Sequence, residues 1–318
     1  MTSLLQEILG DQTLRVIDVG ARDRLAPQFA PLAAQVDIIG FEPDAAECDR
    51  LNAALRGGSW RSAHILPYAV GHTAADRPFY VTEAPELAGL LEPLAEETGR
   101  PGWQVRRVAR VATVALDDLA AQGELPLPVD FIKVDTQGSE LEILHSGEAR
   151  VLDSVLGIAA EVEFRELYRD QPRFSEVEWY LRGRGFELFL LEPAHLRTEW
   201  PLARKRTSYG DALFLRGRAW GRAAPAAARR RLLALYLLYG FYAEAHDLAV
   251  AGDPALAERI AAAYRTLDGG GVRRRLGLLA AALRCAVAPS VANRHRLARL
   301  ARAVAVPDGR SWPVEPPG

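Results

Sequence analysis

The chain has 318 residues, a formal net charge of -2 and 49% hydrophobic residues, so it exceeds the ~100–200 residues of a typical domain and can bury a large core. Its only two cysteines, Cys48 and Cys285, fall in different regions and exclude a disulfide framework, which favours a reducing compartment. No apolar run reaches the ~18 residues that a membrane span needs, so we expect a soluble, cytoplasmic protein.

The charge is divided unevenly along the chain. Residues 1–220 carry 24 basic and 34 acidic side chains, a net charge of -10, whereas residues 221–318 carry 15 and 7, a net charge of +8. We therefore expect an α/β domain over residues 1–220, an all-α domain over 221–306, and a proline-rich disordered tail over 307–318.

The arginines of the helical domain predict a basic face. The interleaved aromatic residues expected of single-strand binding are missing from the series Arg294, Arg296, Arg299 and Arg302, so we expect no nucleic-acid partner. The favoured use of this face is docking onto the acidic domain, within one chain or between the chains of a homo-oligomer.

Strand-like and helix-like segments alternate through residue 220, which predicts a mostly parallel sheet covered by helices on both faces. Residues 78–116 break this rhythm with two extended pieces around a Leu-rich segment, and they are interpreted as an insertion or lid that covers a site. Seven sheet strands are expected, over residues 14–19, 37–41, 65–70, 129–134, 155–160, 186–191 and 212–215.

A glycine follows the first predicted strand, in Val16-Ile-Asp-Val-Gly-Ala21. A glycine there lets the backbone approach a ligand closely. Dinucleotide folds use three glycines in this turn, so the single Gly20 disfavours a nicotinamide-dependent oxidoreductase. An ordinary turn is the alternative. We expect Asp18 and Gly20 to lie beside a cofactor.

The second predicted strand ends at Glu42 and Pro43. A carboxylate ~20 residues beyond such a glycine is where nucleotide-binding sheets hold the two ribose hydroxyls. Alone, Glu42 would be interpreted as an exposed turn residue. Together with Gly20, the pair predicts the site of a nucleotide-type cofactor.

The stretch Asp130-Phe-Ile-Lys-Val-Asp-Thr-Gln-Gly-Ser-Glu140 predicts a buried strand, a tight turn and a helix start. Ligands bind at the carboxyl ends of strands in open α/β sheets, so Asp135 is expected to face the chemistry. Lys133 lies within the buried pattern and needs a partner, for which an ion pair is favoured over a Schiff base.

Several linked motifs resemble the FkbM family of S-adenosylmethionine-dependent methyltransferases, in the family's order and over roughly residues 14–215. They are Val16–Ala21, Phe41-Glu-Pro43, Asn52, Leu116-Asp117, residues 130–140 with Leu144 and Gly147, and Glu161-Val-Glu163. The resemblance implies a class I methyltransferase (Rossmann-like) sheet of seven strands with a reversed final hairpin, and S-adenosyl-L-methionine as cofactor. It also implies O-methyl transfer, commonly to a hydroxyl of a sugar or of a sugar-like ring on a secondary metabolite.

The first motif departs from the family pattern. The family usually continues as Gly-Ala-Asn-x-Gly, whereas this chain has Gly20-Ala-Arg-Asp-Arg24. Arg22 is expected to meet the methionine carboxylate of the cofactor in a charge-assisted pair, with a solvent-facing arginine as the alternative. The departure also leaves open a binding or scaffolding protein that has kept the fold and lost turnover.

Methyl transfer requires an acceptor oxygen held in line and a group that takes its proton. Asp135 and Glu161 each end a central strand, so either is a candidate base. A carboxylate pair that holds a divalent cation is the alternative, although the resemblance does not demand a metal. Candidates for binding a small-molecule or glycan acceptor are Gln137, Glu163, Arg165 and Tyr168, with Tyr168 stacking on a sugar face.

Overall fold

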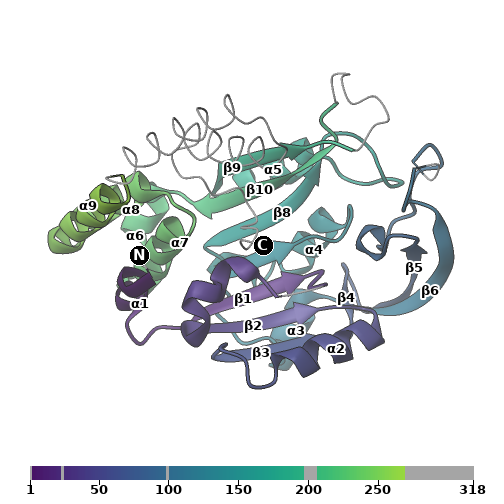
Figure 1. Ribbon diagram of the computed structural model, residues 1–318, viewed down its shortest axis with the longest axis horizontal. Coiled ribbons are helices and arrows are strands. Elements are labelled where there is room, and N and C mark those ends of the chain that lie inside the picture. The colour runs from purple at the N-terminus through teal and green to yellow at the C-terminus, as the bar shows by residue number, and fades with distance from the viewer. Residues whose placement is uncertain (1, 23–24, 98–99, 197–205, 269–318) are drawn as a thin grey trace, which may run out of the picture. The chain divides into compact units, whose positions relative to one another are not determined.

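The computed structural model describes residues 2–22, 25–97, 100–196 and 206–268 (Figure 1). The predicted helices at 272–287 and 291–304, the tail at 307–318, Cys285 and Arg24 lie outside these residues. The described residues divide into two compact units, one of residues 6–232 with Thr2 and one of residues 3–5 with residues 233–268. The unit that contains the sheet includes residues up to Leu232.

The larger unit is built on a seven-stranded sheet, as predicted. Its strand order is β3-β2-β1-β7-β8-β10-β9. Strand β10 runs antiparallel to β8 and β9, whereas the other neighbours pair in parallel, which is the class I methyltransferase arrangement with its reversed final hairpin. The strands are β1 (Leu14–Val19), β2 (Val36–Phe41), β3 (Ser62–Leu66), β7 (Phe131–Val134), β8 (Gly157–Glu163), β9 (Phe186–Ala194) and β10 (Tyr209–Arg216).

The third strand is shorter than the predicted segment 65–70. Strand β3 ends at Leu66, just before Pro67, which has no N–H to donate to a sheet ladder. The chain then enters a second sheet of order β4-β6-β5, formed by β4 (Ala69–Val70), β5 (Ala75–Thr82) and β6 (Val105–Val114). Figure 1 shows this sheet beyond the ends toward which the β1 and β2 arrows point. The predicted insertion is therefore placed at the carboxyl edge of the main sheet.

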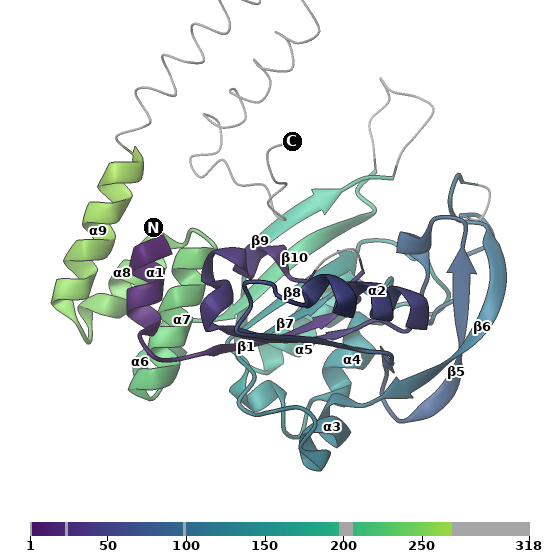
Figure 2. The ribbon, with the colours of Figure 1, turned by 60° about the horizontal axis from the view of Figure 1, so that its bottom comes forward.

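Helices cover both faces of the main sheet (Figure 2). Helices α3, α4 and α5 pack side by side on one face, and α2 lies on the other. The core between them consists of fully buried side chains such as Ile17, Ile132 and Ile158. The helices up to residue 223 are α1 (Thr2–Leu9), η1 (Pro27–Gln35), α2 (Ala45–Leu55), η2 (Pro85–Leu87), α3 (Leu116–Gln122), α4 (Glu140–Ser146), η3 (Leu152–Ser154), α5 (Phe174–Gly183) and α6 (Arg218–Ala223).

Two residues of the sequence motifs fix these helices. Asn52 on α2 accepts the Ile65 N–H and donates to the Ile65 carbonyl oxygen, each at 2.9 Å, so it ties α2 to β3. The Asp117 carboxylate accepts the N–H groups of Ala149, Arg150 and Val151 at 2.6–3.1 Å. Both residues serve the fold rather than the cavity described below.

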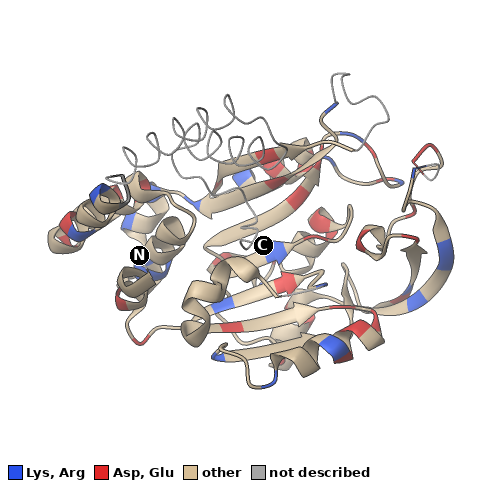
Figure 3. Ribbon diagram, viewed as in Figure 1, with Lys and Arg blue, Asp and Glu red and all other residues tan. Residues whose placement is uncertain are grey.

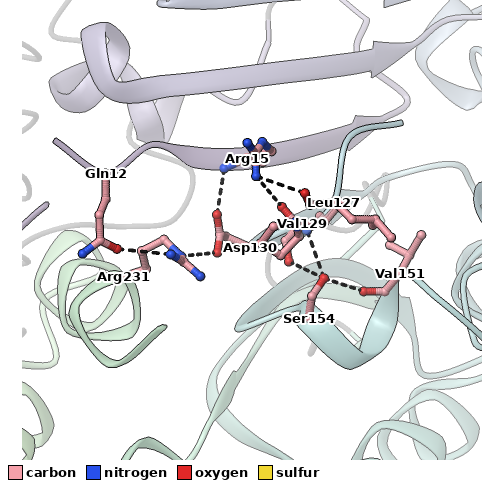
Figure 4. Close-up of polar contacts among 9 residues, drawn as sticks. Gln12, Arg15, Leu127, Val129, Asp130, Val151, Ser154 and Arg231 are labelled. Carbon is pink, nitrogen blue, oxygen red and sulfur yellow. Dashed lines mark hydrogen bonds and ion pairs between the residues drawn. The ribbon is translucent and has the colours of Figure 1, made fainter. Parts of the chain in front are cut away.

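A buried ion pair lies at the amino end of β7 (Figure 4). Asp130 is 1% exposed, and its carboxylate accepts the Arg15 N–H at 2.9 Å and the Arg231 Nε–H at 2.6 Å. Arg231 comes from α7 (Ala226–Leu238) and also donates to Gln12 Oε1 at 3.1 Å. Burial raises the pKa of Asp130, against the Arg231 charge, which lowers it. The ion pair between Arg231 and Asp130 therefore links the first turns of α7 to the sheet.

The second unit contains the rest of α7, α8 (Tyr242–Val250) and α9 (Pro254–Asp268). Helix α8 packs against α9, with Leu248, Ala257 and Ile260 buried. In the described part of the chain, no helix has the length and apolarity required to cross a membrane.

Candidate active site

A cavity of about 340 Å³ opens at the carboxyl edge of the main sheet, within the size range of ligand pockets. It brings together most of the residues that the sequence predicted for a site. Gly20, Arg22, Glu42 and Pro43 line it together with Asp135, Gln137 and Glu161. The turn after the first strand and the acid after the second therefore face the same space as the two candidate bases.

Gly20 has a φ of 80°, which side chains rarely adopt. A Cβ placed on Gly20 would lie 2.1 Å from the carbonyl oxygen of Asp135, so no side chain fits there. The Gly20 N–H donates to the Phe41 carbonyl oxygen at 3.2 Å. Only glycine allows the ends of β1 and β7 to approach this closely, and this leaves bare backbone on the cavity wall.

Glu42 is 3% exposed although it is an acid. Its Oε1 atom accepts the Asp44 N–H at 2.8 Å. Burial raises the pKa of Glu42, while the Asp44 N–H and the Arg22 charge lower it. A buried carboxylate that faces a cavity is stabilised by ligand groups that donate hydrogen bonds to it, and the two hydroxyls of a ribose are such groups.

Three carboxylates form a row across neighbouring strands, and two of them, Asp135 and Glu161, line the cavity. Val134 of β7 pairs with Ala160 of β8, so the next residues, Asp135 and Glu161, are neighbours. Asp211 of β10 pairs directly with Glu161. We call Asp135, Glu161 and Asp211 the acidic row. Figure 3 shows acidic positions on the central strands and at the start of α4.

The acidic row alters the acid-base properties of its members. Burial raises the pKa of Glu161 well above its ordinary range, and the like charge of Asp135 raises it further. Burial, followed by the charge of Asp135, raises the pKa of Asp211 to about 7. Carboxyl groups with raised pKa values in a cavity are candidates for proton transfer, and Glu161 is the member of the row with a raised pKa that lines the cavity.

Lys133 has the ion-pair partner that the sequence predicted. Its Nζ atom lies 3.2 Å from Asp18 Oδ1 and 3.7 Å from Asp135 Oδ2. Burial by itself lowers the pKa of Lys133, but Asp18 and Asp135 outweigh it, so the ammonium stays charged. Asp18 is fully buried and accepts the Ala26 N–H at 2.6 Å. It therefore holds Lys133 and the loop before η1, and it does not line the cavity as a cofactor ligand would.

Gln137 links the two candidate bases. It has a φ of 62°, rare for a residue with a side chain, and its Nε2 atom donates to Glu161 Oε1 at 2.9 Å. Its Oε1 atom accepts the Tyr168 hydroxyl at 2.7 Å, and Tyr168 also reaches the Leu87 carbonyl oxygen at 3.3 Å. Strained backbone of this kind is typical of functional sites.

Three predicted acceptor residues lie away from the cavity wall. Tyr168 is fully buried, with its ring centroid 5.4 Å from that of Trp103, so it cannot stack on a sugar. Arg165 is ion-paired with the buried Glu97. Glu163 is 2% exposed and does not line the cavity. Of the three, Tyr168 supports the wall through its hydrogen bonds to Gln137 and Leu87.

Many of the residues that line the cavity were not predicted from the sequence. The segment around η2, from Pro85 to Leu90, lines the cavity. Aromatic residues from distant segments complete the wall, and no local pattern signals them. They are Tyr68, Phe79, Trp103 and Tyr209.

The buried acids predict that the protein without ligand becomes less stable as pH rises from 5 to 7.5. Burial raises the pKa of Glu140 to about 7, as it does for Asp211, whereas both groups titrate near ~4 in the unfolded chain. Between these values the folded state holds protons that the unfolded state releases, so stability falls with rising pH. Thermal denaturation at constant ionic strength should show a falling Tm and a shallower slope in Asp211→Asn. A flat or rising profile would contradict this account.

The fold and the cavity together define a class I methyltransferase. A family model described as methyltransferase FkbM domain matches residues 18–188. The chain belongs to the FkbM methyltransferase family, whose methyl donor is S-adenosylmethionine. A search of curated proteins gives no match.

The chain is also similar to solved structures, of which three are described here. The methyltransferase FkbM from Methylobacillus flagellatus KT is 14% identical, with a TM-score of 0.38 over 64% of this chain and 43% of that one. Magnesium protoporphyrin IX methyltransferase (ChlM) from Synechocystis PCC 6803 with bound SAM is 10% identical, with a TM-score of 0.34 over 68% and 76%. M. capricolum TrmK in complex with S-adenosyl-homocysteine is 6% identical, with a TM-score of 0.30 over 67% of each chain. This chain thus spans less than half of the Methylobacillus protein.

Proposed function

We propose that this protein transfers a methyl group from S-adenosylmethionine to a hydroxyl of a sugar, or of a sugar-like ring on a secondary metabolite. One observation carries the proposal: the turn at Gly20 and the carboxylate of Glu42 face the same cavity as Asp135 and Glu161. A cofactor site and two candidate bases therefore share one space.

The cofactor half of the cavity has the groups that a nucleoside-bearing sulfonium needs. Glu42 accepts the ribose hydroxyls, and the backbone at Gly20 permits close approach. Arg22 lines the same cavity and supplies a positive charge for the methionine carboxylate. When bound, S-adenosylmethionine supplies an electrophilic methyl group.

The acceptor half contains the groups that handle the proton. As the acceptor oxygen forms its bond to carbon and the sulfur–carbon bond breaks, the hydroxyl proton passes to Glu161. Gln137 holds the Glu161 carboxylate through the hydrogen bond at 2.9 Å, so its orientation is fixed before the acceptor arrives. Leu87 and Trp103 line the cavity and limit the access of water. The cytoplasmic location and the homo-oligomer stay predictions from composition.

Glu42→Gln is expected to weaken S-adenosylmethionine binding by about 10–100-fold, because a hydrogen bond to a charged group contributes about 1.5–3 kcal/mol. Calorimetry with S-adenosylmethionine and S-adenosylhomocysteine measures the change. Glu124→Gln removes the same charge from an exposed position and should leave both affinities unaltered. Equal affinities for the wild type and Glu42→Gln would remove the ribose assignment.

Turnover is tested separately by following release of S-adenosylhomocysteine with a panel of hydroxylated acceptors. We expect turnover in the wild type and a loss of at least about 100-fold in Glu161→Gln, as for removal of a general base. If the protein binds S-adenosylmethionine and methylates no acceptor, the binding or scaffolding alternative is favoured. If it binds neither cofactor form, the proposed function fails.

A further inference from the structure

Acidic side chains outnumber basic ones around the cavity. In the described part of the chain, the cationic side chains on the wall are Arg22, which lies near Glu42, and Lys133, which is paired with the buried Asp18 and with Asp135. Arg165 is ion-paired with Glu97 and does not line the cavity. The acids on the wall are Glu42, Glu86, Asp135 and Glu161, and those just behind it are Asp18, Glu140, Glu163 and Asp211.

The excess negative charge is concentrated on the acceptor side. Neighbouring strands lie ~4.8 Å apart, so Asp135 is one strand from Gly20, while Glu161 and Asp211 are two and three strands away. A cofactor held at Gly20 reaches Asp135 first. Glu161 therefore faces the acceptor, with Asp211 beside it.

The protein itself supplies little to balance these charges. Burial and the neighbouring acids raise the pKa of Glu161 and of Glu163, so both carboxylates are destabilised in their charged form. Within the described residues, no group of three or more potential ligands is arranged to hold a metal ion. A bound organic cation would stabilise the charged acids, whereas a carboxylate or phosphate on the acceptor would be repelled.

Aromatic side chains add a second feature that suits a cation. Trp103 and Tyr209 both line the cavity, and Tyr209 lies on the same strand as Asp211. Aromatic faces attract ammonium groups, especially where water is excluded. Acids and aromatic rings that line the same cavity are thus the surroundings that a protonated amine favours.

We propose that the acceptor carries a protonated amine near the hydroxyl that is methylated, so that its class is an amino sugar or a related cyclic amino alcohol. The amine binds between Glu161 and the aromatic wall, and the hydroxyl faces the methyl donor. The inference rests on the proposed function and specifies its substrate class.

The test uses protein saturated with S-adenosylhomocysteine, so that the cofactor half is filled and no turnover occurs. Four probes that differ at one group are compared by ligand-observed NMR titration: methyl glucosaminide, its N-acetyl derivative, methyl glucoside and methyl glucuronide. We expect the free amine to bind at least about tenfold more tightly than the N-acetyl and hydroxyl forms, and the glucuronide to bind least, because one charge-assisted contact is worth about that factor.

Variants identify the group responsible. Glu161→Gln should reduce the advantage of the amine to less than about threefold, while Glu258→Gln, the same change at an exposed position on α9, should preserve it. The inference is overturned if the glucuronide or the neutral probes bind as tightly as the amine, if none of the four binds, or if the advantage survives Glu161→Gln. Failure to bind S-adenosylhomocysteine would remove the proposed function itself, so the two failures are distinguishable.

Discussion

Gly20→Ala is expected to abolish cofactor binding and to lower the free energy of unfolding by about 3–5 kcal/mol, near the upper limit for a single substitution. The new Cβ would lie 2.1 Å from the Asp135 carbonyl oxygen, and that oxygen belongs to backbone that cannot rotate away. Either the β1 turn or the end of β7 must move, and each lines the cavity. Urea denaturation and calorimetry with S-adenosylmethionine measure the two effects.

Gly123 provides a matched control. Its φ is 79°, against 80° at Gly20, but a Cβ there would meet no atom within 4 Å. Gly123→Ala therefore adds only the cost of a left-handed backbone, about 1–2 kcal/mol, and should leave cofactor affinity unchanged. If the two alanine variants lose equal stability, the close approach of Gly20 to Asp135 is not what requires glycine.

Arg231→Met is expected to lower the free energy of unfolding by about 3–5 kcal/mol at pH 8, because it leaves the carboxylate of Asp130 buried without its cation. Without Arg231 the pKa of Asp130 rises further above its unfolded value, since the charge that lowers it is gone. Below the folded-state pKa the lone acid protonates, so the loss should be smaller at pH 5 than at pH 8. Urea denaturation at both pH values measures the difference.

Two further variants separate the ion pair from general effects of charge. Arg230→Met removes an exposed arginine from the same helix and should change stability by less than about 0.5 kcal/mol. Asp130→Asn with Arg231→Met keeps an acceptor for the Arg15 N–H and removes the buried charge, so it should regain most of the lost stability. A double variant as unstable as Arg231→Met would argue that the methionine disrupts packing instead.

The sheet was predictable because its strands are short apolar runs that end in residues with a chemical role. Gly20, Glu42 and Asp135 were identified by their places just beyond such runs, and the cavity contains all three. The family motifs supplied the reversed hairpin. Local spacing is sufficient to predict a group of site residues when all of them lie at the same edge of a parallel sheet.

The acceptor wall was less accessible to sequence reasoning. Asp211 belongs to the acidic row because β10 lies between β8 and β9 and its register places Asp211 opposite Glu161. No local sequence pattern encodes this strand order or this register. Tyr168 and Arg165 follow a strand end, as cavity residues often do, but Trp103 and Glu97 from the insertion cover them. Because this distant segment covers Tyr168 and Arg165, the two side chains contact other residues of the protein and do not line the cavity.

The placement of β10 between β8 and β9 has a consequence for biosynthesis. The ribosome delivers β8 first and β9 second, yet β9 has no hydrogen-bonding neighbour in the sheet until β10 emerges after it. Until then the nascent chain exposes the free edge of β8, with its apolar Ile158 and Val162, to any other unfinished strand. Premature termination before Tyr209 should therefore yield an aggregation-prone fragment rather than a smaller enzyme.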